Sequence, residues 1–206
     1  MFLTDVGVKC TNCGVNFNSQ QFAIFIDSGK RNSELRQDFG NPQAHLELHE
    51  ICTCPTCGKA DWMTAFPPSG EQSELRQATM TPHLQYRNAA VGAEREGKNN
   101  FQVGIFYVYA AWCADDVGAL PQAREYRHLA ADALAKSLVD FSCPAKQRPE
   151  IEYLIGELLR RAGDFSTAQE QLRHVVTRLP AKFALMARKI MRLAEQGNSE
   201  EIPFDM

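Results

Sequence analysis

Two pairs of cysteines constrain this chain more than any other feature. The pairs are Cys10-Thr11-Asn12-Cys13 and Cys54-Pro55-Thr56-Cys57, and a glycine follows each of them. A gap of two residues lets both thiolates of a pair bind one ion from a tight turn, and two such turns complete the tetrahedral shell that zinc prefers. A closed shell is normally structural, because catalysis needs an open coordination position. We therefore predict one structural Zn²⁺ ion held by Cys10, Cys13, Cys54 and Cys57.

Redox chemistry is the main alternative for the second pair, since Cys-Pro-Thr-Cys also resembles a dithiol motif. A dithiol oxidoreductase places its first cysteine at a helix N-terminus after a buried strand, inside a βαβ pattern. Here Gly58 follows the motif and another CxxC pair offers two further ligands. The sequence therefore favours metal binding over redox catalysis.

Other residues near the second pair could also bind metal. Cys52 stands two residues before Cys54, and His45 and His49 have the HxxxH spacing found in zinc fingers. If residues 44–51 form a strand, both histidines share one face with Glu47, which leaves open a second metal site or a zinc hydrolase. An exposed polar face is the favoured interpretation, because four thiolates are the softer and more complete ligand set.

Several remaining cysteines and histidines have no partner in the sequence pattern. Cys113 lies in an apolar helical stretch and is predicted to be a small buried hydrophobe, whereas Cys143 falls in a loop. The helical histidines are predicted to be solvated; they are His83, His128 and His174.

Composition narrows the function classes. The 206 residues carry a net charge of -3, which gives no overall attraction to nucleic acid or to anionic membranes. The N-terminus lacks a basic run followed by an apolar stretch, and the most apolar segment, 103–114, is shorter than a membrane span. We expect a cytoplasmic protein with no membrane partner.

The chain divides into a β-biased part and a helical part. Residues 1–66 form a predicted zinc ribbon with strands at 21–27 and 44–51, and Pro67-Pro68-Ser69-Gly70 then interrupts the pattern. We predict a linker at 67–80, a helical domain at 81–197 and a flexible tail at 198–206. The predicted fold class is α+β: a small β-rich ribbon followed by an all-α domain of helical hairpins.

Apolar periodicity predicts the helices of the second part. The first starts at Thr81-Pro82 and ends near Gly97, and the next is apolar nearly all round, which is typical of a central helix. The 3.6-residue period continues through the rest of the domain. The remaining predicted helices cover about 121–138, 151–159, 165–179 and 181–195.

Residues 151–180 resemble a tetratricopeptide (TPR) repeat, a hairpin whose two helices touch at small residues. Gly156 falls at the small position of the first helix, Ala168 at that of the second, and Pro180 at the terminal proline. The chain departs from the repeat at Glu152, where the family usually has Trp, and at Leu159, where it usually has Tyr. Residues 101–139 resemble a second, more degenerate hairpin.

The chain as a whole resembles a bacterial family of uncharacterised proteins that joins a zinc-ribbon-like region to TPR-like helices. The matching pieces are 8–14 with Phe17, Asn41-Pro42, 54–58 and 153–165, while Lys59 replaces an expected aromatic residue. The resemblance implies zinc and a helical interaction surface, and it supplies no reaction.

These observations predict a zinc-binding adaptor whose helices bind a protein or peptide. Solenoids need about three repeats to bury their faces, so we expect the ribbon to pack against the first helices or the chain to form a homodimer there. A basic stretch at 173–192 contains no acidic residue and offers nucleic-acid binding as a further alternative, but Phe183 is its only aromatic residue, so the adaptor is favoured. No catalytic constellation is evident.

Overall fold

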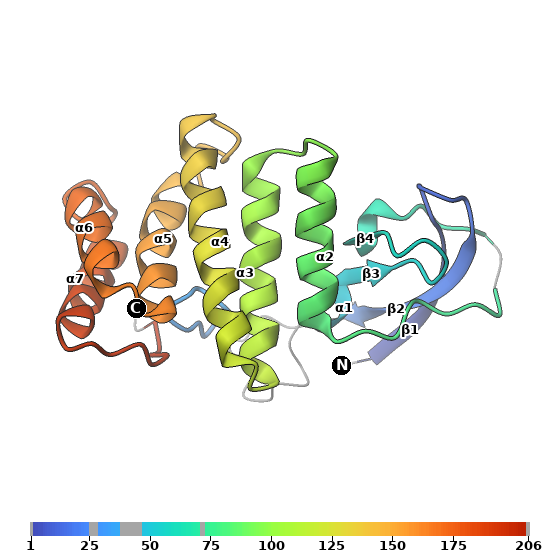
Figure 1. The fold of residues 1–206 in the computed structure, drawn as a ribbon, viewed down its shortest axis with the longest axis horizontal. Helices are drawn as coiled ribbons and strands as arrows, with labels where there is room; N and C mark the ends of the chain where they lie inside the picture. Colours follow the sequence, from blue (N-terminus) through green and yellow to red (C-terminus); the bar gives the residue numbers. More distant parts are fainter. Residues whose placement is uncertain (1, 25–28, 38–46, 71–72, 205–206) are drawn as a thin grey trace.

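The computed structural model describes residues 2–24, 29–37, 47–70 and 73–204, in which two β-hairpins precede a row of helices (Figure 1). Strands β1 (Phe2–Lys9) and β2 (Asn16–Ile24) form the first antiparallel hairpin. The one-turn helix α1 (Glu47–Glu50) leads into the second hairpin, which consists of β3 (Ile51–Thr53) and β4 (Ala60–Trp62). The predicted α+β fold class is confirmed.

The strand predicted at 44–51 is wrong over most of its length. Residues 47–50 form α1, only Ile51 belongs to a strand, and residues 44–46 lie outside the described part of the chain. Long-range contacts explain the helix: Glu47 is buried, its carboxylate accepts a hydrogen bond from Arg36 at 2.6 Å, and its carbonyl accepts one from Tyr86 at 2.7 Å. The strand predicted at 21–27 is β2 as far as Ile24, and residues 25–27 are also outside the description.

Each helix predicted in the second part is present. Figure 1 shows these helices side by side, with the hairpins at one end of the row. Helix α3 is apolar nearly all round because α2 and α4 cover it, and ten of its residues are buried. The helices are α2 (Pro82–Arg95), α3 (Asn100–Asp116), α4 (Leu120–Val139), α5 (Arg148–Ala162), α6 (Phe165–Val175) and α7 (Ala181–Glu195).

Glycines allow two pairs of helices to approach closely. A Cβ atom at Gly156 in α5 would lie 2.4 Å from Cγ of Leu172 in α6, and one at Gly104 in α3 would lie 2.7 Å from Leu134 in α4. Real Cβ atoms do not come so close to a neighbour, so both positions require glycine. The predicted small residue at the α5–α6 contact is thereby confirmed, while the TPR label stays a resemblance.

The second hairpin packs directly against the helices, as expected. Trp62 stacks on Phe106 of α3 with ring centroids 4.7 Å apart, and it meets Tyr86 of α2 edge to face. Ion pairs join the same two parts: Lys59 lies 3.0 Å from Glu96, and Lys98 lies 2.6 Å from the buried Asp61. Lys59, which departs from the family pattern, thus ties the hairpin to the end of α2.

Contacts also cross the boundaries of the predicted domains, whose division stays a prediction. The backbone N–H of Lys9 donates to the carbonyl of Pro67, and that of Gln77 donates to Asn18, both at 2.8 Å. Residues 67–69 and 75–77 therefore flank the two strands of the first hairpin. Near the C-terminus, Arg160 donates to the carbonyls of Asn198 and Glu200, so the described part of the tail contacts α5.

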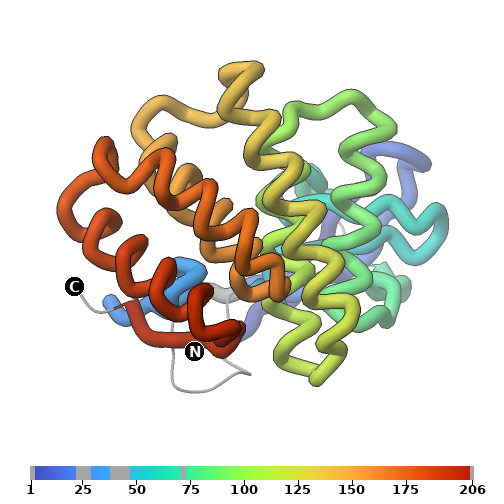
Figure 2. Tube along the Cα trace, turned by 60° about the vertical axis from the view of Figure 1, so that its left-hand side comes forward, coloured from blue at the N-terminus to red at the C-terminus, as the bar shows by residue number. Residues whose placement is uncertain are grey.

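Residues 29–37 lie far from the strands that precede them. The N–H of Ser33 donates to the carbonyl of Ile202, and the N–H of Phe204 donates to that of Arg31. Figure 2 shows this light-blue segment beside the red C-terminal part of the chain. The insertion between the cysteine pairs thus reaches the helical part of the molecule.

Candidate metal centre

The two cysteine pairs occupy turns of the same construction. In each hairpin the first cysteine follows the last residue of the incoming strand, and the second precedes the outgoing strand by three residues. The N–H of Gly14 donates to the carbonyl of Cys10 at 2.9 Å, and the N–H of Gly58 donates to Cys54 at 3.1 Å. Both glycines have φ above +70°, a conformation that glycine adopts without steric cost. The glycine after each pair therefore closes the turn.

The four sulfur atoms converge on one point. Sγ of Cys10 lies 3.6 Å from Sγ of Cys57, Sγ of Cys13 lies 3.7 Å from Sγ of Cys54, and all four atoms are within 4.8 Å of one another. A disulfide would need about 2.05 Å. A tetrahedral zinc site with bonds of about 2.3 Å has sulfur atoms about 3.8 Å apart. The cluster could therefore hold a metal ion such as zinc.

The surroundings of the four thiols differ. Cys10 and Cys54 are buried, whereas Cys13 and Cys57 are exposed. Burial raises the pKa of Cys54 to about 12. Partial burial also opposes ionisation of Cys57, but hydrogen bonds with the side chain of Asn12 and the backbone of Lys59 lower its pKa to about 6. A divalent ion that binds all four sulfur atoms would displace the protons that remain on them.

The other proposed ligands do not join this cluster. Among the described residues, the four sulfur atoms form a group that includes neither Cys52 nor His49, and His45 lies outside the description. Cys52 is fully buried, and burial raises its pKa to about 11. His49 and Glu47 sit on helix α1 rather than on a strand, so the single metal-binding face expected for 44–51 is not formed by residues 47–50.

The burial of Cys113 agrees with the sequence-based prediction, whereas the burial of His83 does not. Cys113 is buried in α3, as predicted. His83 was expected to be solvated, yet it is only 8% exposed and packs near Tyr126, and burial lowers its pKa. His83 lies at the N-terminal end of α2, 6.4 Å from the ring of Tyr126 in α4, and periodicity within α2 does not reveal a contact with another helix.

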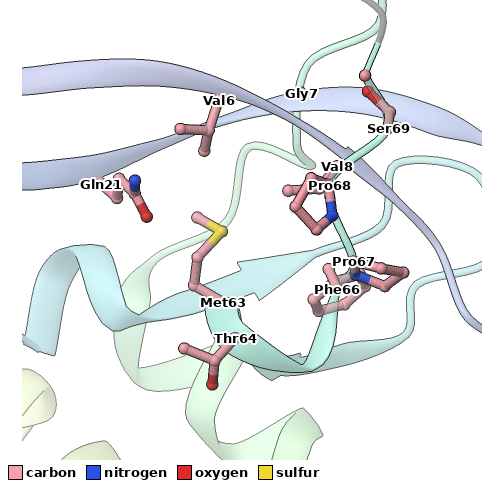
Figure 3. Close-up of a pocket in the computed structure, with 11 residues that line it drawn as sticks. Val6, Gly7, Val8, Gln21, Met63, Thr64, Phe66, Pro67, Pro68 and Ser69 are labelled. Carbon is pink, nitrogen blue, oxygen red and sulfur yellow. The ribbon is translucent and has the colours of Figure 1, made fainter.

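A cavity of about 580 Å³ lies between the first hairpin and residues 63–70 (Figure 3). Its walls are mainly apolar and include Val6, Val8, Met63, Phe66, Pro67 and Pro68. Its polar lining residues are Gln21, Thr64 and Ser69, none of which has a side chain that titrates near neutral pH. The cavity therefore offers binding volume without a group suited to general acid–base catalysis.

Part of the basic stretch 173–192 is engaged in contacts within the chain. Arg178 forms a bidentate ion pair with Glu152, and Lys182 lies over the ring of Phe183, while Arg173, Arg188 and Arg192 are exposed.

In the described part of the chain, no helix combines the length and apolar character that crossing a membrane requires.

No protein-family model matches this chain, and no match is found among curated proteins or among solved structures. The suggested bacterial family therefore rests on the motifs alone. The coarser arrangement that those motifs imply is present, since a four-cysteine cluster on β-hairpins precedes a helical part.

Proposed function

We propose that this chain is a cytoplasmic zinc-binding adaptor. Its ion is structural and is bound by Cys10, Cys13, Cys54 and Cys57, and its TPR-like helices present a surface to a protein or peptide. The convergence of four sulfur atoms within 4.8 Å carries the proposal. Two separate hairpins supply these atoms, so one ion would join segments that are far apart in sequence.

The structural role of the ion follows from ligand chemistry. Four thiolates fill the tetrahedral shell of zinc and leave no position for a water or substrate molecule. Each hairpin has only two strands, and small units of this kind gain much of their folding free energy from the metal. Function then belongs to the helical surface rather than to the ion.

Metal analysis with thiol counting tests this proposal. Protein purified without added zinc should contain one zinc ion per chain, and alkylation should leave Cys10, Cys13, Cys54 and Cys57 unmodified until a chelator is added, while the buried Cys113 and Cys143 should react only after the helices unfold. A chelator should expose those four together. Metal-free protein that forms and reduces a disulfide in a cycle would instead establish the dithiol oxidoreductase and refute the adaptor.

A further inference from the structure

The first hairpin extends beyond the segment that flanks β1. The N–H of Ser69 donates to the carbonyl of Gly7 at 3.0 Å, so residues 67–69 run beside the second half of β1 as a short antiparallel strand. That pairing ends at Gly70, where a φ of +69° takes the backbone out of the extended conformation. Among the described residues, the first half of β1 has no neighbouring strand on this side. We call residues 3–6 the open edge.

The backbone of the open edge carries hydrogen-bonding groups without partners. Successive residues of an antiparallel strand direct their N–H and C=O groups to opposite sides. The carbonyl of Gly7 bonds to Ser69, away from β2, so the N–H and C=O groups of Leu3 and Asp5 also point away from β2. No backbone hydrogen bond reaches these four groups in the part of the chain that the structure describes. Both residues are exposed, so the groups are open to a further strand.

The opposite edge of the hairpin is less suited to pairing. β2 has one extra residue, at position 23, between the two residues that pair with Phe2 and Leu3. A bulge of this kind interrupts the row of backbone groups and protects an edge from further pairing. The open edge of β1 has no such bulge, and it contains neither lysine nor proline. β1 is therefore the strand whose edge accepts a partner.

A second copy of the chain fits the open edge in one register. Antiparallel pairing centred on Thr4 sets Leu3 of each copy opposite Asp5 of the other, and the four free groups of each copy then form hydrogen bonds. Its centre pairs threonine with threonine, which is a favourable cross-strand contact. Pairing centred on Asp5 would oppose two carboxylates and bring Leu3 to Gly7, whose carbonyl is already bonded to Ser69.

The side chains of the open edge are compatible with this register. The carboxylate of Asp5 accepts a hydrogen bond from Gln20 at 2.9 Å and lies 3.6 Å from Arg76, so its charge is balanced within its own copy. Leu3 is 43% exposed on the same face of the strand, and the second copy would cover it. Val6 points to the other face and lines the apolar cavity, whose wall the added strand would extend.

We propose that two copies of this chain associate through their open edges, so that two hairpins become one four-stranded sheet in the order β2–β1–β1–β2. A hairpin of two strands is marginally stable by itself, and a sheet of three or more strands overcomes that limit. The arrangement has the two-fold symmetry that is commonest among homo-oligomers. A contact of a few residues is smaller than a standard interface, so the dimer is reversible and its population depends on protein concentration.

Analytical ultracentrifugation of the full-length, zinc-loaded protein over a series of concentrations tests this proposal. The unaltered chain should shift from monomer to dimer as its concentration rises. Thr4→Lys and Thr4→Glu should each weaken the association, because like charges then face each other across the two-fold axis. An equimolar mixture of the two variants should restore it. Thr4 is exposed, so neither change should disturb the fold of the monomer.

Asp5→Pro tests the backbone hydrogen bonds. Proline removes the N–H that points outward, and edge strands tolerate proline at such a position. The association should weaken about thirtyfold, because each half of the symmetric contact loses one hydrogen bond. Asp5→Ala is the matched control, since it removes the same carboxylate but keeps the N–H, and its dimer should persist.

An unaltered chain that stays monomeric up to the limit of its solubility would overturn the proposal. A dimer that Asp5→Pro leaves unchanged would also overturn it, as would a mixture of Thr4→Lys and Thr4→Glu that associates no better than either variant alone, because the copies would then meet on another surface. If Asp5→Pro does not fold, the mixing experiment decides. Normal zinc content in each variant separates these results from a failure of the metal proposal.

Discussion

The hairpin part and the helical part hold themselves together by different means. The first hairpin shares with residues 52–66 a small buried cluster in which cysteines lie among a few apolar residues, including Val8, Phe17 and Phe66. The helices share a much larger core that extends from Ile51 of the second hairpin to Ala168 of α6. A hairpin of only two strands does not bury enough apolar surface for independent stability, whereas packed helices do. The comparison indicates that only the hairpin part should depend on a metal.

Removal of one sulfur ligand should give the largest effect and tests this contrast directly. Cys10→Ser should abolish zinc binding and unfold the first hairpin, because structural zinc contributes on the order of 10 kcal/mol to folding. The helices should persist, so far-UV circular dichroism should retain most of its helical signal while hairpin amide resonances collapse in NMR spectra. Cys52→Ser is the matched control, since Cys52 is buried beside the site but outside the cluster. Stoichiometric zinc in Cys10→Ser would show that the ligand assignment is wrong.

Glu34→Ala should destabilise the helical part by about 1.5–3 kcal/mol, because it removes one of the two carboxylates that pair with the buried Arg127 and leaves only Asp115. Urea denaturation of the zinc-loaded protein measures this loss. Glu152→Ala is the control: its partner Arg178 is 59% exposed, and a pair of that kind contributes about 0–1 kcal/mol. Equal losses in the two variants would mean that the buried pair has no special role.

Gly156→Ala should cost about 1–3 kcal/mol, because the added methyl group would collide with Leu172 and force α5 and α6 apart. Gly92→Ala in α2 offers a matched control. No atom lies within 4 Å of its added Cβ, so the substitution should stabilise the helix by up to about 1 kcal/mol. Thermal melts of both variants, made at constant zinc concentration, measure the difference. A stable Gly156→Ala protein would contradict the close helix contact.

The smallest expected effect is an acid limb in the stability of the helical part. Burial opposes ionisation of Glu34, but the charge of Arg127 outweighs it and lowers the pKa below its usual value near 4.5. A folded-state pKa below the unfolded one means that the stabilisation is complete above about pH 4.5 and is lost as the pH falls through the folded value. Denaturation midpoints between pH 3 and 6 measure this limb. Glu34→Gln should flatten it, whereas an unchanged limb would assign it to other carboxylates.

Much of the fold could be predicted because its signals are local. The CxxC-Gly pattern specifies a tight turn, and the 3.6-residue apolar period specifies each helix from α2 to α7. The strand predicted for 44–51 is wrong because that prediction used only a local signal, the alternation of Leu46 and Leu48. Residues 47–50 instead form a helix in which Glu47 makes a buried ion pair with Arg36, a contact that alternation does not reveal. The predicted solvent exposure of His83 is wrong because its burial depends on contacts with residues of another helix, such as Tyr126.

The sequence alone determined the two CxxC turns, the order of helices α2 to α7, and the glycine at the contact of α5 and α6, since each depends on spacing within a short segment. Only the tertiary structure brought the two cysteine pairs together and placed residues 29–37 on the helices. The Glu34–Arg127 pair joins residues 93 positions apart, and no periodic pattern encodes a contact at that separation. Such contacts arise when apolar surfaces pack, and that packing also determines which charges are buried together.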